Sequence, residues 1–152
     1  MFKTTNQLTL EMAFDPTSKF LACGTSDSHI KVFDILKGFQ THNFLGHRGI
    51  ITKLAFFPGA DDTLKLISCA EDFVIRVWDL VMKKEIGQMK PKGKDDNMAH
   101  MTTSIVFTSD RQTIISGGKD GCLHFWNAHD NFKHISTIKI ETLGGLKYDE
   151  IN

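Results

Sequence analysis

The sequence predicts an all-β protein made of three copies of one four-stranded antiparallel unit. Short runs rich in β-branched and aromatic residues alternate with turn residues, and no stretch has the pattern of a helix. Three segments, "SDSHIKVFDI" (26–35), "EDFVIRVWDL" (71–80) and "KDGCLHFWNA" (119–128), align without gaps. Each has an aspartate six residues before an aromatic residue, and a residue with a short polar side chain follows the aromatic. The aspartates Asp27, Asp72 and Asp120 are 45 and 48 residues apart, which indicates a repeat architecture.

Four strands are expected in each repeat. In the first they are 8–14, 20–24, 29–35 and 40–45; in the second, 50–57, 64–69, 74–80 and 84–89; in the third, 102–107, 113–117, 122–128 and 134–140. Each run is too short for a helical stripe. Asp-Pro, Pro-Gly and Ser-Asp pairs separate the first strand from the second in each repeat, and these residues favour tight turns.

Composition and charge limit the class of protein. The chain has 152 residues, 41% of them hydrophobic and 24% charged, as in ordinary soluble globular proteins. Its formal net charge is zero, so no global field attracts nucleic acid or an anionic membrane. No apolar run approaches the roughly 18 residues of a membrane helix, and residues 1–14 lack the apolar core of a signal peptide. Three cysteines, an odd number, argue against a disulfide framework and indicate a reducing compartment.

A Trp-Asp pair at the end of the third strand of such a repeat is typical of a WD40 β-propeller blade, and the chain resembles that family over nearly its whole length. The resemblance implies blades at 1–46, 47–97 and 98–143, with 144–152 as a tail or the start of a next blade. Propellers have roughly four to eight blades, so three form an incomplete propeller. The missing blades come from the rest of a longer chain, from other copies or from a partner; we favour the longer chain.

The resemblance also implies a structural tetrad, a buried hydrogen-bond chain that is stable only when every member is paired. The second repeat matches all four positions, with His47, Ser68, Asp72 and Trp78. The third repeat supplies Ser116, Asp120 and Trp126. There, Met98 stands in the histidine position and His100 is out of register. The first repeat has Asp27 but carries Cys23 and Phe33 in place of Ser and Trp. Because Phe cannot donate an indole hydrogen bond, we expect packing to hold this blade together.

The sequence holds no catalytic or metal-binding motif with usable spacing, so we expect neither enzyme activity nor a cofactor or metal. Cys122 and His124 share a strand face and could form half of a metal site, but ordinary strand residues explain them as well. His47, Ser68 and Asp72 invite comparison with a catalytic triad, yet the resemblance assigns them to the structural tetrad. The glycine-rich segment 116–121 lacks P-loop spacing and is expected to be a strand-to-strand turn.

Two surfaces are candidates for binding a partner. In WD40 propellers, partners often contact residues just before the tetrad aspartate, which here are Ser26, Glu71 and Lys119, and Arg48 next to His47 is a further candidate. The second surface is the Lys-rich segment 82–96, in which Lys90, Lys92 and Lys94 could meet phosphates or an acidic partner. Acidic residues dilute its charge and no aromatic residues interleave to stack bases, so a solvated loop is the alternative.

Longer blocks narrow the resemblance within the WD40 proteins. The block 12–58, with "MAFDPTS", "THNFLGH" and "GIITKLAFFP", continues into "LKLISCAEDFVIRVWDL" (64–80) and resembles the first propeller of the transducin β-like protein 3 family. This resemblance implies a nucleolar scaffold of the small-subunit processome. Its partners would be other WD40 and processome proteins of the UtpB type, with indirect contact to U3 snoRNP and pre-rRNA as a further expectation. No membrane contact is expected. The alternative is a WD40 adaptor of a ubiquitin ligase or a Gβ-like signalling scaffold.

Overall fold

The computed structural model describes residues 7–59, 61–91 and 101–140. All the regular elements in these ranges are β-strands, twelve in number, and they form three four-stranded antiparallel sheets. Blade 1 contains β1 (Thr9–Phe14), β2 (Phe20–Thr25), β3 (Ile30–Asp34) and β4 (Phe39–Phe44). Blade 2 contains β5 (Ile51–Pro58), β6 (Leu64–Ala70), β7 (Ile75–Asp79) and β8 (Lys84–Met89). Blade 3 contains β9 (Thr102–Phe107), β10 (Thr113–Gly118), β11 (Cys122–Asn127) and β12 (His134–Lys139).

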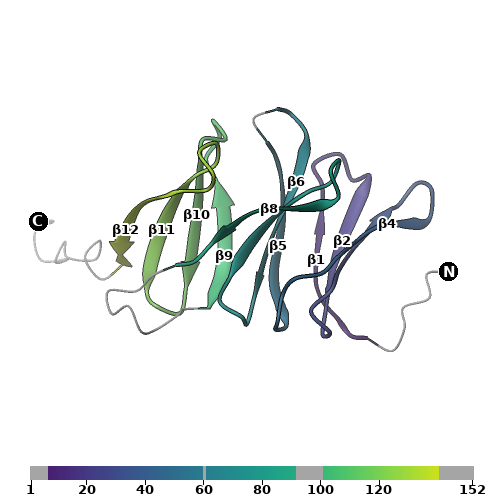
Figure 1. Cartoon of the computed structure of the whole chain (residues 1–152), viewed down its shortest axis with the longest axis horizontal. Helices are drawn as coiled ribbons and strands as arrows, with labels where there is room; N and C mark the ends of the chain where they lie inside the picture. The colour runs from purple at the N-terminus through teal and green to yellow at the C-terminus, as the bar shows by residue number, and fades with distance from the viewer. Residues whose placement is uncertain (1–6, 60, 92–100, 141–152) are drawn as a thin grey trace, which may run out of the picture.

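Each sheet pairs its strands in chain order, and the three sheets stand side by side (Figure 1). The predicted all-β class and the incomplete propeller of three blades are confirmed, and the predicted strands agree with the observed ones to within a residue or two. Among the described residues, no helix has the length and hydropathy that crossing a membrane requires.

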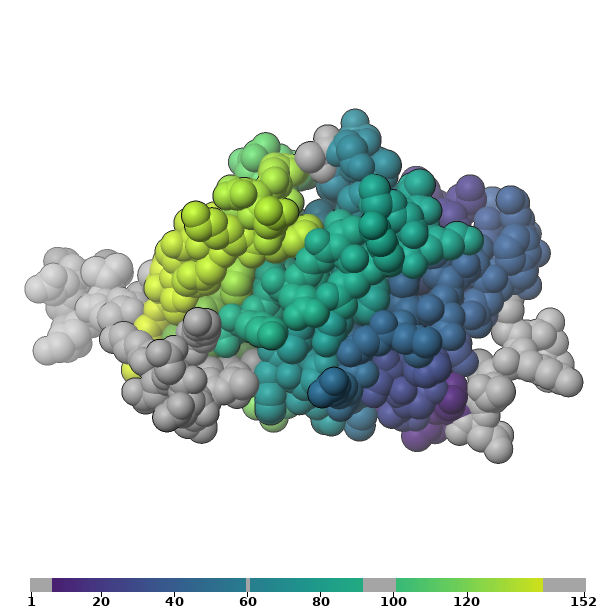
Figure 2. All heavy atoms as spheres, in the orientation of Figure 1, coloured from purple at the N-terminus to yellow at the C-terminus, as the bar shows by residue number. Residues whose placement is uncertain are grey.

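Blade 2 is covered on both faces. Because strand side chains alternate between the two sides of a sheet, blade 2 contributes to two separate cores. One core lies between blades 1 and 2 and consists of Ala22, Ile30, Val32, Phe44, Ile51, Leu54, Phe56, Leu66, Ala70, Trp78 and Leu80. The other core joins blades 2 and 3 through Phe57, Ile67, Cys69, Ile75, Val77, Met89, Ile105, Ile114 and Trp126. In Figure 2 the atoms of blade 2 (teal) fill the space between blade 1 (purple to blue) and blade 3 (green to yellow).

The residue that follows the aromatic residue of each repeat explains why the third strand ends where it does. In blade 1, Asp34 Oδ1 accepts a hydrogen bond from the backbone N–H of Lys37, at 3.0 Å. In blade 2, Asp79 Oδ1 accepts one from Met82, at 2.7 Å. In blade 3, Asn127 Oδ1 accepts one from the N–H of the second residue after it, at 2.9 Å. A short side chain with an acceptor oxygen therefore forms the turn into the fourth strand in all three blades.

Blade 1 leaves one apolar face open. Met12 of β1 pairs with Cys23 of β2, as Leu54 of β5 pairs with Ser68 of β6, so Met12 and Leu54 hold equivalent places. Leu54 is 2% exposed beneath blade 1, whereas Met12 is 61% exposed, and Phe14 on the same face is 55% exposed. The side of blade 1 that corresponds to the covered face of blade 2 is therefore an uncovered apolar surface.

Candidate protein-interaction site

One end of the blade stack carries three equivalent turns, which we call the rim. Each turn joins the second and third strands of a blade, and one backbone hydrogen bond ties each turn to the segment before the first strand. The bonds run from Ser26 N to Leu8 O (2.9 Å), from Glu71 N to Ile50 O (3.0 Å), and from Lys119 N to Met101 O (3.1 Å). The repeated bond places Ser26, Glu71 and Lys119 at matching positions, and all three are exposed.

In blade 2 a continuous hydrogen-bond chain supports the rim. Trp78 donates its indole Nε1–H to Ser68 Oγ, at 2.7 Å. Ser68 Oγ lies 2.7 Å from His47 Nε2, and His47 Nδ1 lies 2.9 Å from Asp72 Oδ2. Indole can only donate and an ionised carboxylate can only accept, so Ser68 donates to Nε2 and His47 donates from Nδ1. The structure brings together all four side chains named for the tetrad of this blade.

The chain of bonds fixes Arg48 next to the turn. The backbone N–H of Arg48 donates to Asp72 Oδ2 at 3.0 Å, and its side chain is exposed. Gly49 follows, and a side chain there would meet Asp72 N and Glu71 Cβ at 3.0 Å. The segment 47–49 therefore lies tightly against the β6–β7 turn. As a result, Arg48 and Glu71 are presented from a rigid base.

Burial sets the charge state of the tetrad. Burial lowers the pKa of His47 below its usual value and outweighs the bond to Asp72, which acts in the opposite direction. Burial would raise the pKa of Asp72, but hydrogen bonds from His47 and from the Arg48 N–H lower it more. At neutral pH the pair is therefore a neutral imidazole that donates to a carboxylate.

The hydrogen-bond order Asp72–His47–Ser68 is that of a catalytic triad, but a substrate cannot reach the serine. Ser68 is fully buried, and its oxygen already accepts the indole N–H of Trp78. A nucleophile must reach the substrate atom that it attacks. In this arrangement the three side chains hold the blade together. Within the described ranges, no group of three or more His, Cys, Asp and Glu side chains is placed to hold a metal ion.

In blade 3 a histidine of the third strand bonds the tetrad aspartate. Trp126 Nε1–H donates to Ser116 Oγ at 2.9 Å, as in blade 2. The buried Asp120 carboxylate is bonded by His124 Nε2 at 2.6 Å, and His124 Nδ1 lies 3.0 Å from Thr137 Oγ1 of β12. His124, considered in the sequence as half of a metal site, is therefore part of a blade-3 hydrogen-bond network.

In blade 1 only the aspartate of the tetrad is present, at the turn between the second and third strands. Thr25 Oγ1 donates to the carboxylate of Asp27, and His29 Nε2 lies 3.7 Å from the same carboxylate. Cys23 is buried and Phe33 is half-buried at the Ser and Trp positions. Local bonds therefore shape the rim turn of blade 1, and the apolar core with blade 2 holds its sheet in place.

The Lys-rich segment joins the stack at the rim. Lys90 follows Met89, which pairs with Ile75 at the start of β7, and Lys90 is exposed. The segment therefore leaves blade 2 at the end that carries Glu71. Lys92 and Lys94, together with Met98 and His100, lie outside the described residues.

One feature of the sequence could have indicated the role of His124. It stands two residues before Trp126, as Arg76 stands two residues before Trp78. Arg76 Nη2 lies 3.8 Å from Asp72 Oδ2, so this position reaches the tetrad aspartate in both blades. A histidine there is the residue type that can take over the bond to Asp120.

The comparison with protein families agrees with this geometry. The model described as "WD domain, G-beta repeat" matches residues 7–34, 38–79 and 96–127, so the three matches contain β1–β3, β4–β7 and β9–β11.

The chain belongs to the WD40 repeat family.

Among WD40 proteins, it is 36% identical to transducin beta-like protein 3 of Bos taurus over 76% of its length. It is 30% identical to WD repeat and SOCS box-containing protein 1 of Homo sapiens over 75% of its length. It is 27% identical to periodic tryptophan protein 2 homolog of Schizosaccharomyces pombe over 91%. The matched region spans only 14%, 25% and 16% of these relatives. The resemblance to transducin β-like protein 3 found in the sequence is confirmed, and the chain is a WD40 module of the kind that binds other proteins.

Proposed function

We propose that the chain is a non-catalytic scaffold of the small-subunit processome, located in the nucleolus. The observation that carries this proposal is the 36% identity to transducin beta-like protein 3, which runs over 76% of the chain. The resemblance to that family implies a place among UtpB-type WD40 proteins. It also implies an assembly that contains the U3 snoRNP and nascent pre-rRNA.

The rim supports a role in protein contact. Ser26, Arg48, Glu71 and Lys119 are exposed on turns that backbone bonds and the tetrad hold in place. A surface that is ordered before binding loses little conformational entropy when a partner docks. The side chains carry both signs of charge and the chain has no net charge, which favours a protein partner over direct contact with RNA.

The test is a pull-down of the tagged full-length protein from its own cells, probed for U3 snoRNA and 5′ pre-rRNA. We expect enrichment of both, and a loss of enrichment in the rim variant Arg48→Glu/Glu71→Lys. The matched control is Asp130→Lys, a charge reversal on the exposed β11–β12 turn at the other end of the blades. Absence of both RNAs from the unmodified protein would refute the processome role.

RNA contact by the Lys-rich segment is tested separately. Each lysine that neutralises a phosphate adds salt-dependent affinity. Changing Lys90, Lys92 and Lys94 to Gln should therefore weaken ultraviolet crosslinking of the segment to RNA. Unchanged crosslinking would leave the RNA to other subunits and restrict this protein to protein contacts.

A second candidate function is that of an adaptor of a ubiquitin ligase or a Gβ-like signalling scaffold. The similarity to WD repeat and SOCS box-containing protein 1, at 30% identity, favours it. Recovery of ubiquitin-ligase or signalling subunits in the same pull-down, without U3 snoRNA, would select this function.

A further inference from the structure

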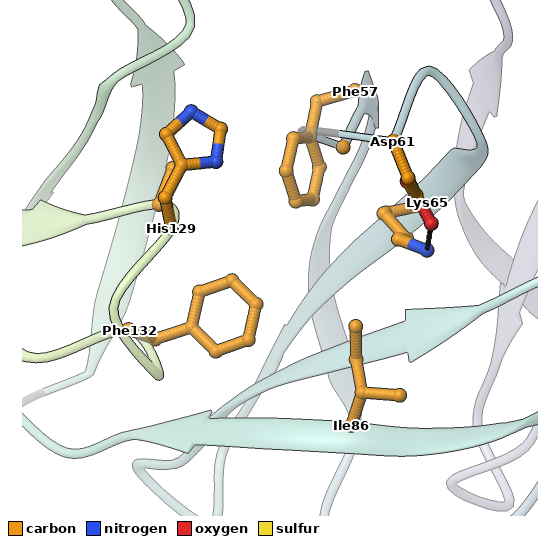
Figure 3. A pocket seen from close by; sticks show the side chains of 8 residues that line it. Phe57, Asp61, Lys65, Ile86, His129 and Phe132 are labelled. Atoms are coloured by element: carbon orange, nitrogen blue, oxygen red, sulfur yellow. Dashed lines mark hydrogen bonds and ion pairs between the residues drawn. The ribbon is translucent and has the colours of Figure 1, made fainter.

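A hollow of about 300 Å³ lies between blades 2 and 3 at the end opposite the rim (Figure 3). Its lining comes from β5 and the turn after it, from β6, from β8 and from the β11–β12 turn: Phe57, Gly59, Asp61, Lys65, Ile86, Ala128, His129 and Phe132. Pockets that take small ligands span roughly 300–1,000 Å³. The hollow lies at the lower end of that range, which suits one inserted side chain.

The apolar walls of the hollow are held in place by packing. The ring of Phe57 stacks on Phe107 of blade 3, with centroids 5.0 Å apart and planes 15° from parallel. Phe132 lies over Gly87 of β8, where a Cβ atom would come within 2.2 Å of its ring. Phe57, Phe132 and Ile86 thus surround the same space from two blades (Figure 3). The walls are aromatic and ordered before any ligand enters.

The polar side of the hollow has an excess of negative charge. The Lys65 side chain is only 9% exposed, and its single positive charge is shared between the buried Asp79 carboxylate and Asp61 Oδ2, which lies 3.4 Å away. The Asp61 carboxylate is 59% exposed at the mouth. An adjoining hollow shares Gly59 and His129 and adds Asp62, Asp110 and Arg111. Arg111 is paired with Asp62 at 3.2 Å, so around the two hollows the carboxylates of Asp61, Asp62, Asp79 and Asp110 outnumber the Lys65 and Arg111 cations.

We propose that this hollow binds an arginine side chain presented by a linear segment of a partner protein. The methylene stem of arginine suits the walls formed by Ile86 and Phe132, and its planar guanidinium stacks on aromatic faces. Asp61 Oδ1 already accepts two bonds from Thr63, but Oδ2 faces only the Lys65 ammonium at 3.4 Å and can accept a charge-assisted N–H bond from that guanidinium. The adjoining acidic hollow gives room for a neighbouring residue of the peptide. The site lies at the other end of the blades from the rim, so it adds a second contact surface to the scaffold.

The test is an NMR titration of the ¹⁵N-labelled chain with N-acetyl-L-arginine amide and with its neutral isostere, N-acetyl-L-citrulline amide. We expect saturable shifts of the backbone amides of Gly59, Ile86 and Phe132 with arginine. The affinity for citrulline should be about tenfold lower, because it lacks the charge-assisted bond. Asp61→Asn should reduce arginine binding to the citrulline level, and Asp61→Glu should keep most of it.

A matched control separates this site from general electrostatic attraction. Glu71→Gln removes an exposed carboxylate at the rim and should leave arginine binding unchanged. Phe132→Ala should abolish the saturable shifts while the dispersed spectrum of the folded chain remains. Equal affinity for arginine and citrulline, unchanged binding by Asp61→Asn, or no saturable shift at these three amides would overturn the proposal. None of these outcomes depends on the processome pull-down, so the two proposals fail separately.

Discussion

His124 Nε2 lies 2.6 Å from Asp120 Oδ2, so blade 3 closes its network with a histidine from the same hairpin. In blade 2 the equivalent carboxylate, Asp72, is bonded by His47 from the segment that precedes the blade. Both blades contain a buried carboxylate bonded by a buried imidazole, but the two imidazoles come from different positions in the repeat.

The first prediction concerns this exchange. Removing the imidazole takes a hydrogen-bond donor from a buried carboxylate, which costs about 1–3 kcal/mol. We therefore expect His124→Ala and His47→Ala each to lower the free energy of unfolding by an amount of that order. Urea denaturation followed by tryptophan fluorescence measures it. The exposed His129→Ala is the control and should change stability by less than about 0.5 kcal/mol. A His124→Ala chain as stable as the control would show that the Asp120 bond does not stabilise blade 3.

The second prediction separates packing from hydrogen bonding at Trp78. Its ring stacks on Phe44 of blade 1, with centroids 5.0 Å apart, and its N–H bonds Ser68. Trp78→Ala removes both interactions and should cost about 3–5 kcal/mol, as for other large core aromatics. Trp78→Phe keeps most of the stacking, so its cost should be about 1–3 kcal/mol. Equal losses in the two variants, measured by urea denaturation followed by circular dichroism, would assign the whole effect to the indole N–H.

Blade 1 shows how much of the fold and of the tetrad positions can be predicted from the sequence. The periodic strands, the turn residues and the aligned Asp and Trp positions all arise from local rules, and they predicted the three sheets. The replacement of Ser and Trp by Cys23 and Phe33 predicted a blade without the indole bond. The sequence could not show that Thr25 donates to Asp27 instead, because that bond depends on the geometry of one turn.

Contacts between residues far apart in the chain could not be predicted from the sequence for a related reason. Lys65 is a charged residue in a strand, and the sequence alone places it in solvent. In the structure it is buried, with its ammonium group against Asp79. Phe132 lies against Gly87, which is 45 residues earlier in the chain. Only the packing of blade 3 on blade 2 brings these two residues together. The hollow between blades 2 and 3 depends on such pairings and carries no motif.

The third prediction is a loss of stability on acidification. Burial lowers the pKa of His47 and of His42 from the usual 6.5, so the unfolded chain takes up protons that the folded chain does not. Their contribution to stability is therefore complete above pH 6.5 and is lost as the pH falls below it. The lowered pKa of Asp72 acts in the same direction at lower pH.

Urea midpoints at pH 7.5, 6.5 and 5.5 measure this effect. The midpoint should fall across the series for the unmodified chain, fall less for His47→Asn or His42→Asn, and least for the double variant. A midpoint that rises toward pH 5.5 would contradict a neutral His47 in the folded state.

The fourth prediction compares two glycines at equivalent places in the second strands. A Cβ atom on Gly24 would lie 2.5 Å from Ile51 Cγ2 in the core between blades 1 and 2. A Cβ atom on Gly117 would meet its nearest neighbour, Leu123 Cδ2, at 3.4 Å. Gly24→Ala should therefore destabilise the chain by about 1–3 kcal/mol through overpacking. Gly117→Ala should be neutral or slightly stabilising, since it restricts the unfolded chain. Thermal melts of the two variants test the difference, and a neutral Gly24→Ala would mean that the two blades can separate at little cost.

The fifth prediction concerns the open face of blade 1. In blade 2 the same face is covered by the blade before it, which presents Ala22, Ile30, Val32 and Phe44. Since Met12 and its neighbours are uncovered, the chain on its own should associate as its concentration rises. Met12→Lys places a charge on that face and should shift the association to concentrations at least about tenfold higher. Ser109→Lys adds the same charge on an exposed turn and should not. Sedimentation velocity over a range of concentrations measures both. If Met12→Lys associates like the unmodified chain, this face does not mediate the association. A second copy would then not take the place of the blade that covers this face in a complete propeller.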